Sequence, residues 1–168
     1  MILIAIGSNL PSVAGSPLET CNAALKLLPE RGITVARTSN WYETAPVPVS
    51  DQPWFVNGAA RVETTLGPDD MLRVLHDVEA HFARVRHERN AARTLDLDLL
   101  AYGDQVRSGE GVQVPHPRLH ERAFVLYPLM DVAPGWRHPV LGQTVTEMLK
   151  NLPQGLEKSQ IRPVLARP

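Results

Sequence analysis

The chain has 168 residues, of which 43% are hydrophobic and 21% are charged, and its formal net charge is −1. These values are typical of one globular domain with a sizeable core, so we expect a single domain over residues 1–168. The balanced charge excludes a protein that works mainly by coating nucleic acid or an acidic membrane, because it creates no global positive field. We therefore expect small-molecule partners, no nucleic acid and no membrane. We also expect a monomer, because no large apolar stripe remains once the core is assigned.

The single cysteine, Cys21, excludes an intramolecular disulfide and any CxxC metal motif. This usage agrees with a reducing compartment, and we expect the cytoplasm. The opening MILIAIG is apolar but short, lacks a basic flank and runs into a polar turn. It therefore predicts a first strand over 2–7 and not a signal peptide.

The segment SPLE at 16–19 predicts a helix start, with Ser16 as N-cap, a proline at the first helical position and a glutamate three residues after the cap. Apolar residues at spacings of three and four carry this helix to about Leu28. The rest of this half predicts, in order, a strand at 32–44, a proline-rich loop at 45–53 and a strand at 54–66.

GPDD at 67–70 opens a second predicted helix, which should end near Arg86. An arginine-rich loop, an aspartate-bearing strand, a short hairpin at 103–114, a short helix within 114–134 and a final helix seeded by TVTE at 144–147 follow. We expect about the last 15 residues to form a loosely packed tail. The order β-α-β-β-α-β predicts an α+β, ferredoxin-like sandwich with a C-terminal extension.

The stretch TLDLDLL at 94–100 alternates leucines with two aspartates, Asp96 and Asp98. That period places both carboxylates on one face of a half-buried strand, about 6.5 Å apart along it. Two carboxylates at this spacing can jointly hold a hard cation such as Mg²⁺. The alternative is a structural ion pair between an aspartate and a neighbouring arginine.

RVRHERNAAR, residues 84–93, places four arginines directly before the aspartates. Dense positive charge beside dense negative charge indicates a metal–polyphosphate site, in which metal ions and guanidinium groups share the phosphate oxygens. The alternative is a solvated helix end whose arginines only complement the helix dipole. Neither a Walker A motif nor GxGxxG is present, so side chains and metal would have to hold the phosphates.

RNAARTLDLDLL at 89–100 resembles the signature of the 6-hydroxymethyl-7,8-dihydropterin pyrophosphokinase family. Four further segments agree with this resemblance in collinear order: AIGSNL near the start, YETAPVPVSDQPWFVNGA at 42–59, EAHFARVR at 79–86 and VPHPRLHERAFVLYPL at 114–129. The resemblance implies an ATP- and Mg²⁺-dependent enzyme of folate biosynthesis. Such an enzyme transfers pyrophosphate from ATP to the pterin and releases AMP.

The resemblance also implies the roles of single residues. Asp96 and Asp98 correspond to the ligands of two Mg²⁺ ions, and with Arg84 and Arg93 they form the expected catalytic set. The expected ATP-binding residues are Glu79, Arg84, Arg86, Arg93, His116 and Arg122. The expected pterin-binding residues are Thr44, Ala45, Val47, Phe55, Asn57 and Phe124. An isolated phenylalanine is usually an ordinary core residue. Only their positions in the matched motifs favour a binding role for Phe55 and Phe124.

The chain departs from the family pattern at Asn90, His87 and Pro117, where a tryptophan, a lysine and an aromatic residue are common. We expect these changes to affect closure over ATP more than the reaction class. Two other functions stay open at this point. A nucleotidyltransferase also combines a Gly-Ser turn with an acidic pair, although nearly ninety residues separate them here, and a non-catalytic ferredoxin-like domain would use its charges structurally.

Overall fold

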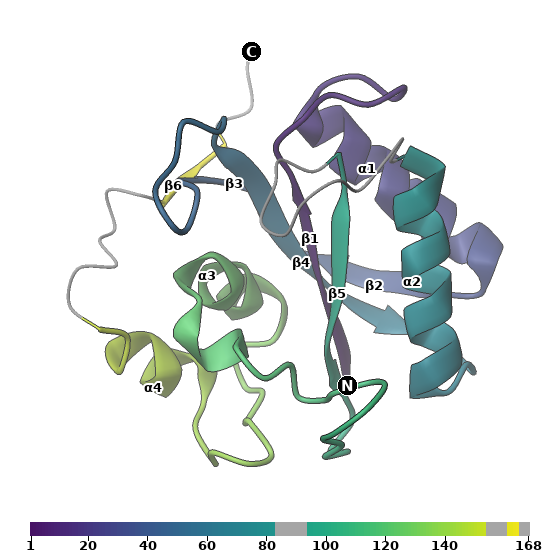
Figure 1. The fold of residues 1–168 in the computed structure, drawn as a ribbon. Helices are drawn as coiled ribbons and strands as arrows, with labels where there is room; N and C mark the ends of the chain where they lie inside the picture. The colour runs from purple at the N-terminus through teal and green to yellow at the C-terminus, as the bar shows by residue number, and fades with distance from the viewer. Residues whose placement is uncertain (83–93, 154–160, 165–168) are drawn as a thin grey trace.

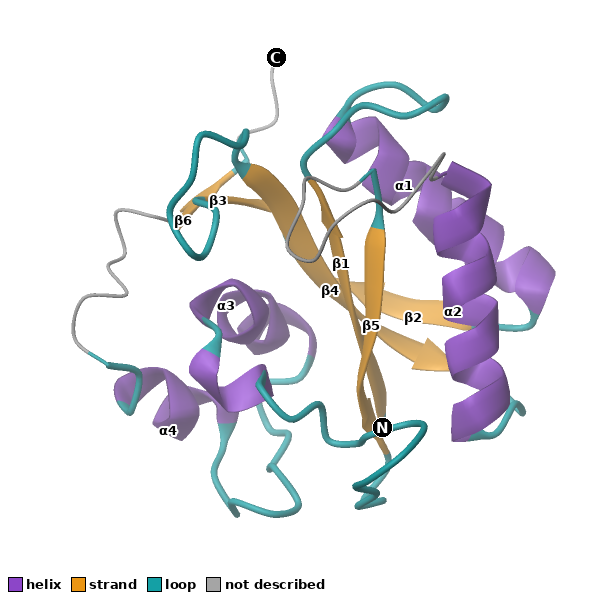
Figure 2. Ribbon diagram, viewed as in Figure 1, coloured by secondary structure: helices purple, strands orange, loops and turns teal. Residues whose placement is uncertain are grey.

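The protein, described here from a computed structural model over residues 1–82, 94–153 and 161–164, folds as one antiparallel sheet with helices on both faces (Figures 1 and 2). The strands are β1 (Ile2–Ser8), β2 (Thr34–Thr38), β3 (Tyr42–Thr44), β4 (Phe55–Glu63), β5 (Asp96–Tyr102) and β6 (Ile161–Pro163). The α-helices are α1 (Pro17–Leu27), α2 (Pro68–Phe82), α3 (Ala123–Val132) and α4 (Val145–Lys150), and short 3-10 helices span Leu28–Arg31 and Leu119–Glu121.

The strand order is β5-β1-β4-β3-β6, and β2 also pairs with β4. Since β2 and β3 follow one another along the same edge of β4, they together act as one strand. Counted in this way, the first hundred residues run β-α-β-β-α-β, and the predicted ferredoxin-like α+β fold is confirmed.

The single strand expected over 32–44 is wrong, because the segment forms two strands, and residues 39–41 between them belong to neither. At the break, Ser39 N donates to Ala59 O and Ala59 N donates to Ser39 Oγ, both at 2.9 Å. The Ser39 side chain thus replaces one backbone acceptor of the ladder. The Trp41 ring lies over Gly58, where an added Cβ would come within 2.5 Å of it.

Helix starts agree closely with the sequence. Ser16 with Glu19, and Thr144 with Glu147, each form a reciprocal capping box at the start of α1 and α4. The predicted end of the second helix near Arg86 lies outside the described residues. The predicted hairpin at 103–114 is reduced to one bridge, between Arg107 and Val114.

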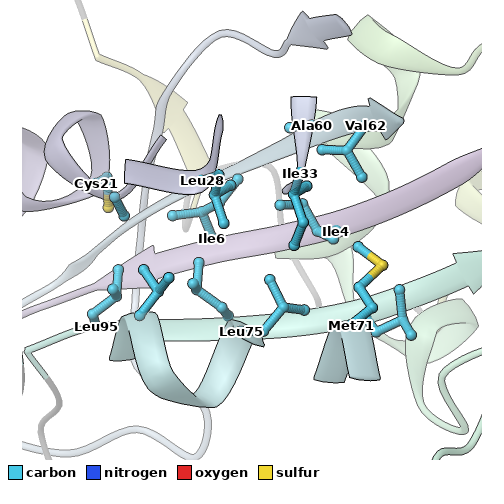
Figure 3. Packing of buried hydrophobic residues seen from close by; sticks show 14 of the residues in the cluster. Ile4, Ile6, Cys21, Leu28, Ile33, Ala60, Val62, Met71, Leu75 and Leu95 are labelled. Atoms are coloured by element: carbon cyan, nitrogen blue, oxygen red, sulfur yellow. The ribbon is translucent and has the colours of Figure 1, made fainter. Parts of the chain in front are cut away.

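Two hydrophobic cores lie on opposite faces of the sheet. The first packs α1 and α2 against one face through residues such as Ile4, Leu28 and Leu75 (Figure 3). The second packs α3 and α4 on the other face through Leu3 and Leu126, among others. Each fully buried leucine or isoleucine contributes about 1.5–3 kcal/mol, so the sheet is fixed from both sides.

Part of the expected loose tail is a strand. Residues Ile161–Pro163 pair antiparallel with β3, and Val164 N donates to Trp41 O at 2.9 Å. Among the described residues, no helix has the length and apolar character that crossing a bilayer requires.

Candidate active site

A cavity of about 290 Å³ opens on the α3 face of the sheet. It lies where the C-terminal end of β1 runs between the N-terminal ends of β4 and β5. Its walls come from four strands (β1, β3, β4 and β5), the β3–β4 loop, the segment before α3 and the start of α3. The lining residues are Ala5, Ile6, Gly7, Thr44, Ala45, Pro46, Val47, Pro48, Ser50, Gln52, Phe55, Asn57, Asp96, Asp98, His116, Arg122, Phe124 and Val125.

Both aspartates of the TLDLDLL stretch line this cavity. The intervening leucines are almost fully buried in the core under α1 and α2, with Leu97 only 1% exposed. Alternation along β5 therefore turns Asp96 and Asp98 to the opposite face, as predicted. Beside them on β1, Gly7 faces Asp96 in register.

Glu79 does not line the cavity. It lies on α2, on the other side of the sheet, and is 4% exposed. Its Oε1 accepts a hydrogen bond of 2.8 Å from the Leu97 backbone N–H, between the two aspartates. In the described residues this carboxylate therefore binds the backbone of β5. Its expected contact with ATP stays a prediction.

Two basic residues, His116 and Arg122, reach the cavity from the segment before α3. Burial, assisted by the charge of Arg122, lowers the pKa of His116 to about 4. His116 Nδ1 accepts a hydrogen bond of 3.1 Å from Arg118 N, so the neutral ring carries its proton on Nε2. The site thus offers one neutral donor and one guanidinium. The other predicted arginines, Arg84, Arg86 and Arg93, and the variant positions His87 and Asn90, lie outside the described residues.

The six expected pterin-binding residues all line the same cavity: Thr44, Ala45, Val47, Phe55, Asn57 and Phe124. Two of them are joined, because Asn57 Nδ2 donates to Thr44 Oγ1 at 2.6 Å. This bond fixes the orientation of the Asn57 amide group, and the amide oxygen lies close to Gly7. The two phenylalanines belong to separate elements, β4 and α3, and could cover a flat ring from two sides.

Sequence reasoning missed Gln52 and Gly7 as lining residues. Asn9 Nδ2 donates to Gln52 Oε1 at 3.1 Å and to Pro53 O at 3.2 Å, which anchors the end of the β3–β4 loop. A Cβ on Gly7 would come within 2.5 Å of Asn57 Oδ1. Gly7 lies opposite Asn57 on β4. Its place at the cavity could not be predicted from the sequence, because it depends on how the two strands pair.

Comparison with known proteins places this geometry in a family. The sequence profile of the 7,8-dihydro-6-hydroxymethylpterin-pyrophosphokinase (HPPK) family matches residues 3–134. The chain belongs to the HPPK family. The matched residues contain every lining residue of the cavity, whereas β6 lies beyond them.

Relatives within the HPPK family are of two kinds. The chain is 41% identical over 161 residues to a 2-amino-4-hydroxy-6-hydroxymethyldihydropteridine pyrophosphokinase of Pseudomonas aeruginosa, covering 94% of this chain and 95% of that protein. It is 45% identical over 131 residues to the mitochondrial folate synthesis bifunctional protein of Arabidopsis thaliana, covering 78% of this chain and 23% of that protein. The chain thus spans about a quarter of the length of such bifunctional relatives.

Solved HPPK structures share the fold. A triple mutant of the Plasmodium falciparum HPPK-DHPS protein aligns with a TM-score of 0.68 at 16% identity, covering 96% of this chain and 46% of that one. An HPPK-DHPS in complex with substrates aligns with a TM-score of 0.67 at 12% identity, over 89% of this chain and 44% of that one.

The donor set at the acidic pair fits Mg²⁺. Two carboxylates from alternate positions of one strand provide hard oxygen ligands at the cavity wall. Residues 1–82, 94–153 and 161–164 contain no group of three or more His, Cys, Asp or Glu arranged to hold a metal alone. Mg²⁺ bound here would complete its shell with phosphate and water oxygens, which is its usual arrangement with nucleotides.

Proposed function

We propose that this chain transfers a pyrophosphoryl group from ATP to 6-hydroxymethyl-7,8-dihydropterin, giving the pterin diphosphate and AMP in folate biosynthesis. The observation that carries this proposal is the union of two half-sites in one cavity. Asp96 and Asp98 line the same space as Phe55, Asn57 and Phe124. Membership of the HPPK family and the single-function bacterial relatives support the same reaction.

The pterin half-site selects a flat, polar-edged ring. Phe55 and Phe124 would stack on its faces, while Asn57 and Thr44 read the aminopyrimidinone edge as a prearranged pair of polar groups. Backbone groups of Ala45 and Val47 would complete that edge. A ring held in this slot would share the cavity with the acidic pair.

The phosphate half-site brings basic and acidic side chains together in one cavity. Arg122 and His116 would donate hydrogen bonds to phosphate oxygens of ATP. Asp96 and Asp98 would hold two Mg²⁺ ions, which when bound neutralise charge on the triphosphate. The assignment of Arg84, Arg86 and Arg93 to the triphosphate, and of Glu79 to the nucleotide site, rests on the sequence.

The reaction is an in-line displacement. The pterin hydroxyl oxygen forms a bond to the β-phosphorus, the bond from that phosphorus to the α–β bridging oxygen breaks, and AMP leaves with that oxygen. The hydroxyl proton passes to solvent. Since a direct in-line displacement needs no covalent intermediate with the enzyme, the residues would contribute positioning and charge stabilisation.

One observation supports the nucleotidyltransferase alternative, and another argues against it. Gly7 does lie beside Asp96 in the sheet, despite their distance in sequence. However, the neighbouring Ser8 hydroxyl donates to the Thr94 carbonyl oxygen at 2.6 Å and is fully buried, which is a structural role. The non-catalytic alternative does not account for a cavity that carries the matched family residues.

The decisive assay mixes the purified chain with ATP, Mg²⁺ and 6-hydroxymethyl-7,8-dihydropterin and identifies the products by chromatography. We expect AMP and a pyrophosphorylated pterin, and AMP only when the pterin is present. Formation of ADP, or of a nucleotide attached to the acceptor, would contradict the proposal. No turnover with any of these substrates would leave the non-catalytic alternative.

The acidic pair is tested by Asp98→Ala. Removing one of two metal-binding carboxylates should lower kcat by at least about a hundredfold while the thermal unfolding midpoint changes little, because the side chain lines a cavity. The matched control is Asp77→Ala, which removes an exposed carboxylate from α2 on the other face of the sheet. An Asp98→Ala enzyme as fast as the control would disprove the metal role.

A further inference from the structure

The β3–β4 loop supplies a large part of the cavity wall. Loop positions 45, 46, 47, 48, 50 and 52 all line the cavity, and the loop joins two paired residues, Thr44 and Phe55. The strand that starts this loop, β3, has only three residues. Such a short strand gives weak support to a ten-residue loop unless other groups hold its ends.

A segment from the far end of the sequence lies against the base of this loop. Strand β6 pairs with the edge of β3 that β4 leaves open, with Arg162 opposite Glu43 (Figure 1). The pairing places residues more than a hundred positions apart in the sequence side by side.

The Arg162 side chain contacts both ends of the loop. Its Nε donates to Glu43 Oε2 at 2.7 Å, on the residue before Thr44. Its guanidinium carbon lies 4.8 Å from the ring centroid of Trp54, on the residue before Phe55. One side chain therefore spans the loop entrance and the loop exit, through an ion pair and a cation–π contact.

We propose that Arg162 is a positioning residue that closes the base of the 45–54 loop and so fixes the pterin side of the cavity. The residue does not line the cavity, and it lies beyond the residues that match the family profile. Its effect on substrate rests on the proposed function, whereas its effect on the loop does not. The residues it joins, Glu43 and Trp54, each precede a cavity residue directly.

The geometry assigns the effect to one substrate. The loop forms the pterin half-site, while Arg122 and His116 approach from the segment before α3. Loss of the Arg162 contacts should therefore weaken pterin binding and leave ATP binding nearly unchanged. Because both contacts are solvent-exposed, with the Arg162 side chain 65% exposed, we expect about a fivefold effect and not a total loss.

The experiment compares Arg162→Ala with Arg73→Ala in the full chain. Arg73 is a matched control, since its side chain is 74% exposed and forms an ion pair with Asp70 on α2, remote from the cavity. Hydrogen–deuterium exchange of the 45–54 amides is measured first, without substrates. We expect faster exchange in Arg162→Ala and wild-type exchange in Arg73→Ala.

Steady-state kinetics follow on the same proteins. Arg162→Ala should raise the pterin KM about fivefold with kcat and the ATP KM close to wild type, and Arg162→Lys should recover part of this loss through its charge. Unchanged loop exchange in Arg162→Ala would overturn the proposal, and so would equal rises in both KM values. A wild-type chain without turnover would instead defeat the proposed function, while the exchange result would still decide the role of Arg162.

Discussion

At the scale of single residues, Phe124 combines two contacts at the mouth of the cavity. Its ring lines the cavity wall, and the Arg122 guanidinium carbon lies 5.5 Å from the ring centroid. The side chain thus contacts Arg122, which is a proposed phosphate-binding residue, while it lines the cavity proposed to hold the pterin ring. A cation–π contact with this neighbouring charge therefore holds the ring in place.

Replacing this ring gives a residue-scale prediction. Phe124→Ala should weaken pterin binding about tenfold or more and ATP binding much less, because stacking area is lost only on the pterin side. Equilibrium titration with each ligand separately measures both effects. Tyr127→Ala serves as the control, since it removes a half-buried aromatic ring from the same helix that does not line the cavity. A larger loss for ATP than for pterin would assign Phe124 to the other half-site.

At the scale of elements, the break between β2 and β3 shapes the sheet beside the cavity. Ser39, Trp41 and Gly58 form this break, and the Trp41 carbonyl also accepts the Val164 N–H. The close approach of the indole to the backbone of β4 requires a residue without Cβ at position 58. Glycine is thus required at position 58 for packing and not for backbone flexibility.

Gly58→Ala should therefore destabilise the protein. The new Cβ would lie 2.5 Å and 2.6 Å from two Trp41 ring carbons, so we expect a loss of about 1–3 kcal/mol in the free energy of unfolding. Urea titration measures this loss. Gly135→Ala, where no atom lies within 4 Å of an added Cβ, should change stability by much less. Equal losses in the two variants would refute the packing requirement.

Local signals in the sequence predicted most elements but not this break. The capping boxes at Ser16 and Thr144 and the alternation around Asp96 are encoded by neighbouring residues, and each was confirmed. The segment 32–44 has a continuous strand-like composition, and only the partner strand reveals that Ser39 Oγ takes over a ladder bond. Local patterns do not contain such cross-strand exchanges.

The same distinction holds for the candidate site. The motif residues from Thr44 to Phe124 that line the cavity could be predicted, because they resemble a known pattern. The contacts of Arg162 could not be predicted, because they join residues 43, 54 and 162 across the sheet. Proline and charge in the last residues favoured a loose tail, yet three of them find hydrogen-bonding partners on the open edge of β3.

At the scale of the whole molecule, stability should depend on pH through a buried histidine. His138 is 5% exposed, and its Nδ1 accepts hydrogen bonds from Val140 N and Leu141 N at 3.2 Å and 3.1 Å. Burial lowers the pKa of His138, and the neighbouring His120 acts in the same direction. The folded protein therefore binds fewer protons here than the unfolded chain does.

It follows that stability falls as the pH falls below the ordinary histidine pKa of 6.5. We expect the free energy of unfolding to drop between about pH 7 and about pH 5, measured by urea titration without ligands. His138→Gln should reduce this dependence to the part that His116, whose pKa is also lowered, contributes. His76→Gln, on the exposed side of α2, should retain all of it. A rise in stability on acidification that disappears in His138→Gln would contradict the assignment.

Two of the outer strands, β5 and β6, differ in how their open edges could pair with a strand from another copy of the protein. Exposed strand edges readily recruit further strands, and proteins suppress this by shortening, charging or covering them. On β5, the Glu79 carboxylate already takes the Leu97 amide hydrogen that an incoming strand would need. On β6, the described strand has three residues, which include a charged arginine and a proline. The described residues of these two strands are thus poor templates for an added strand.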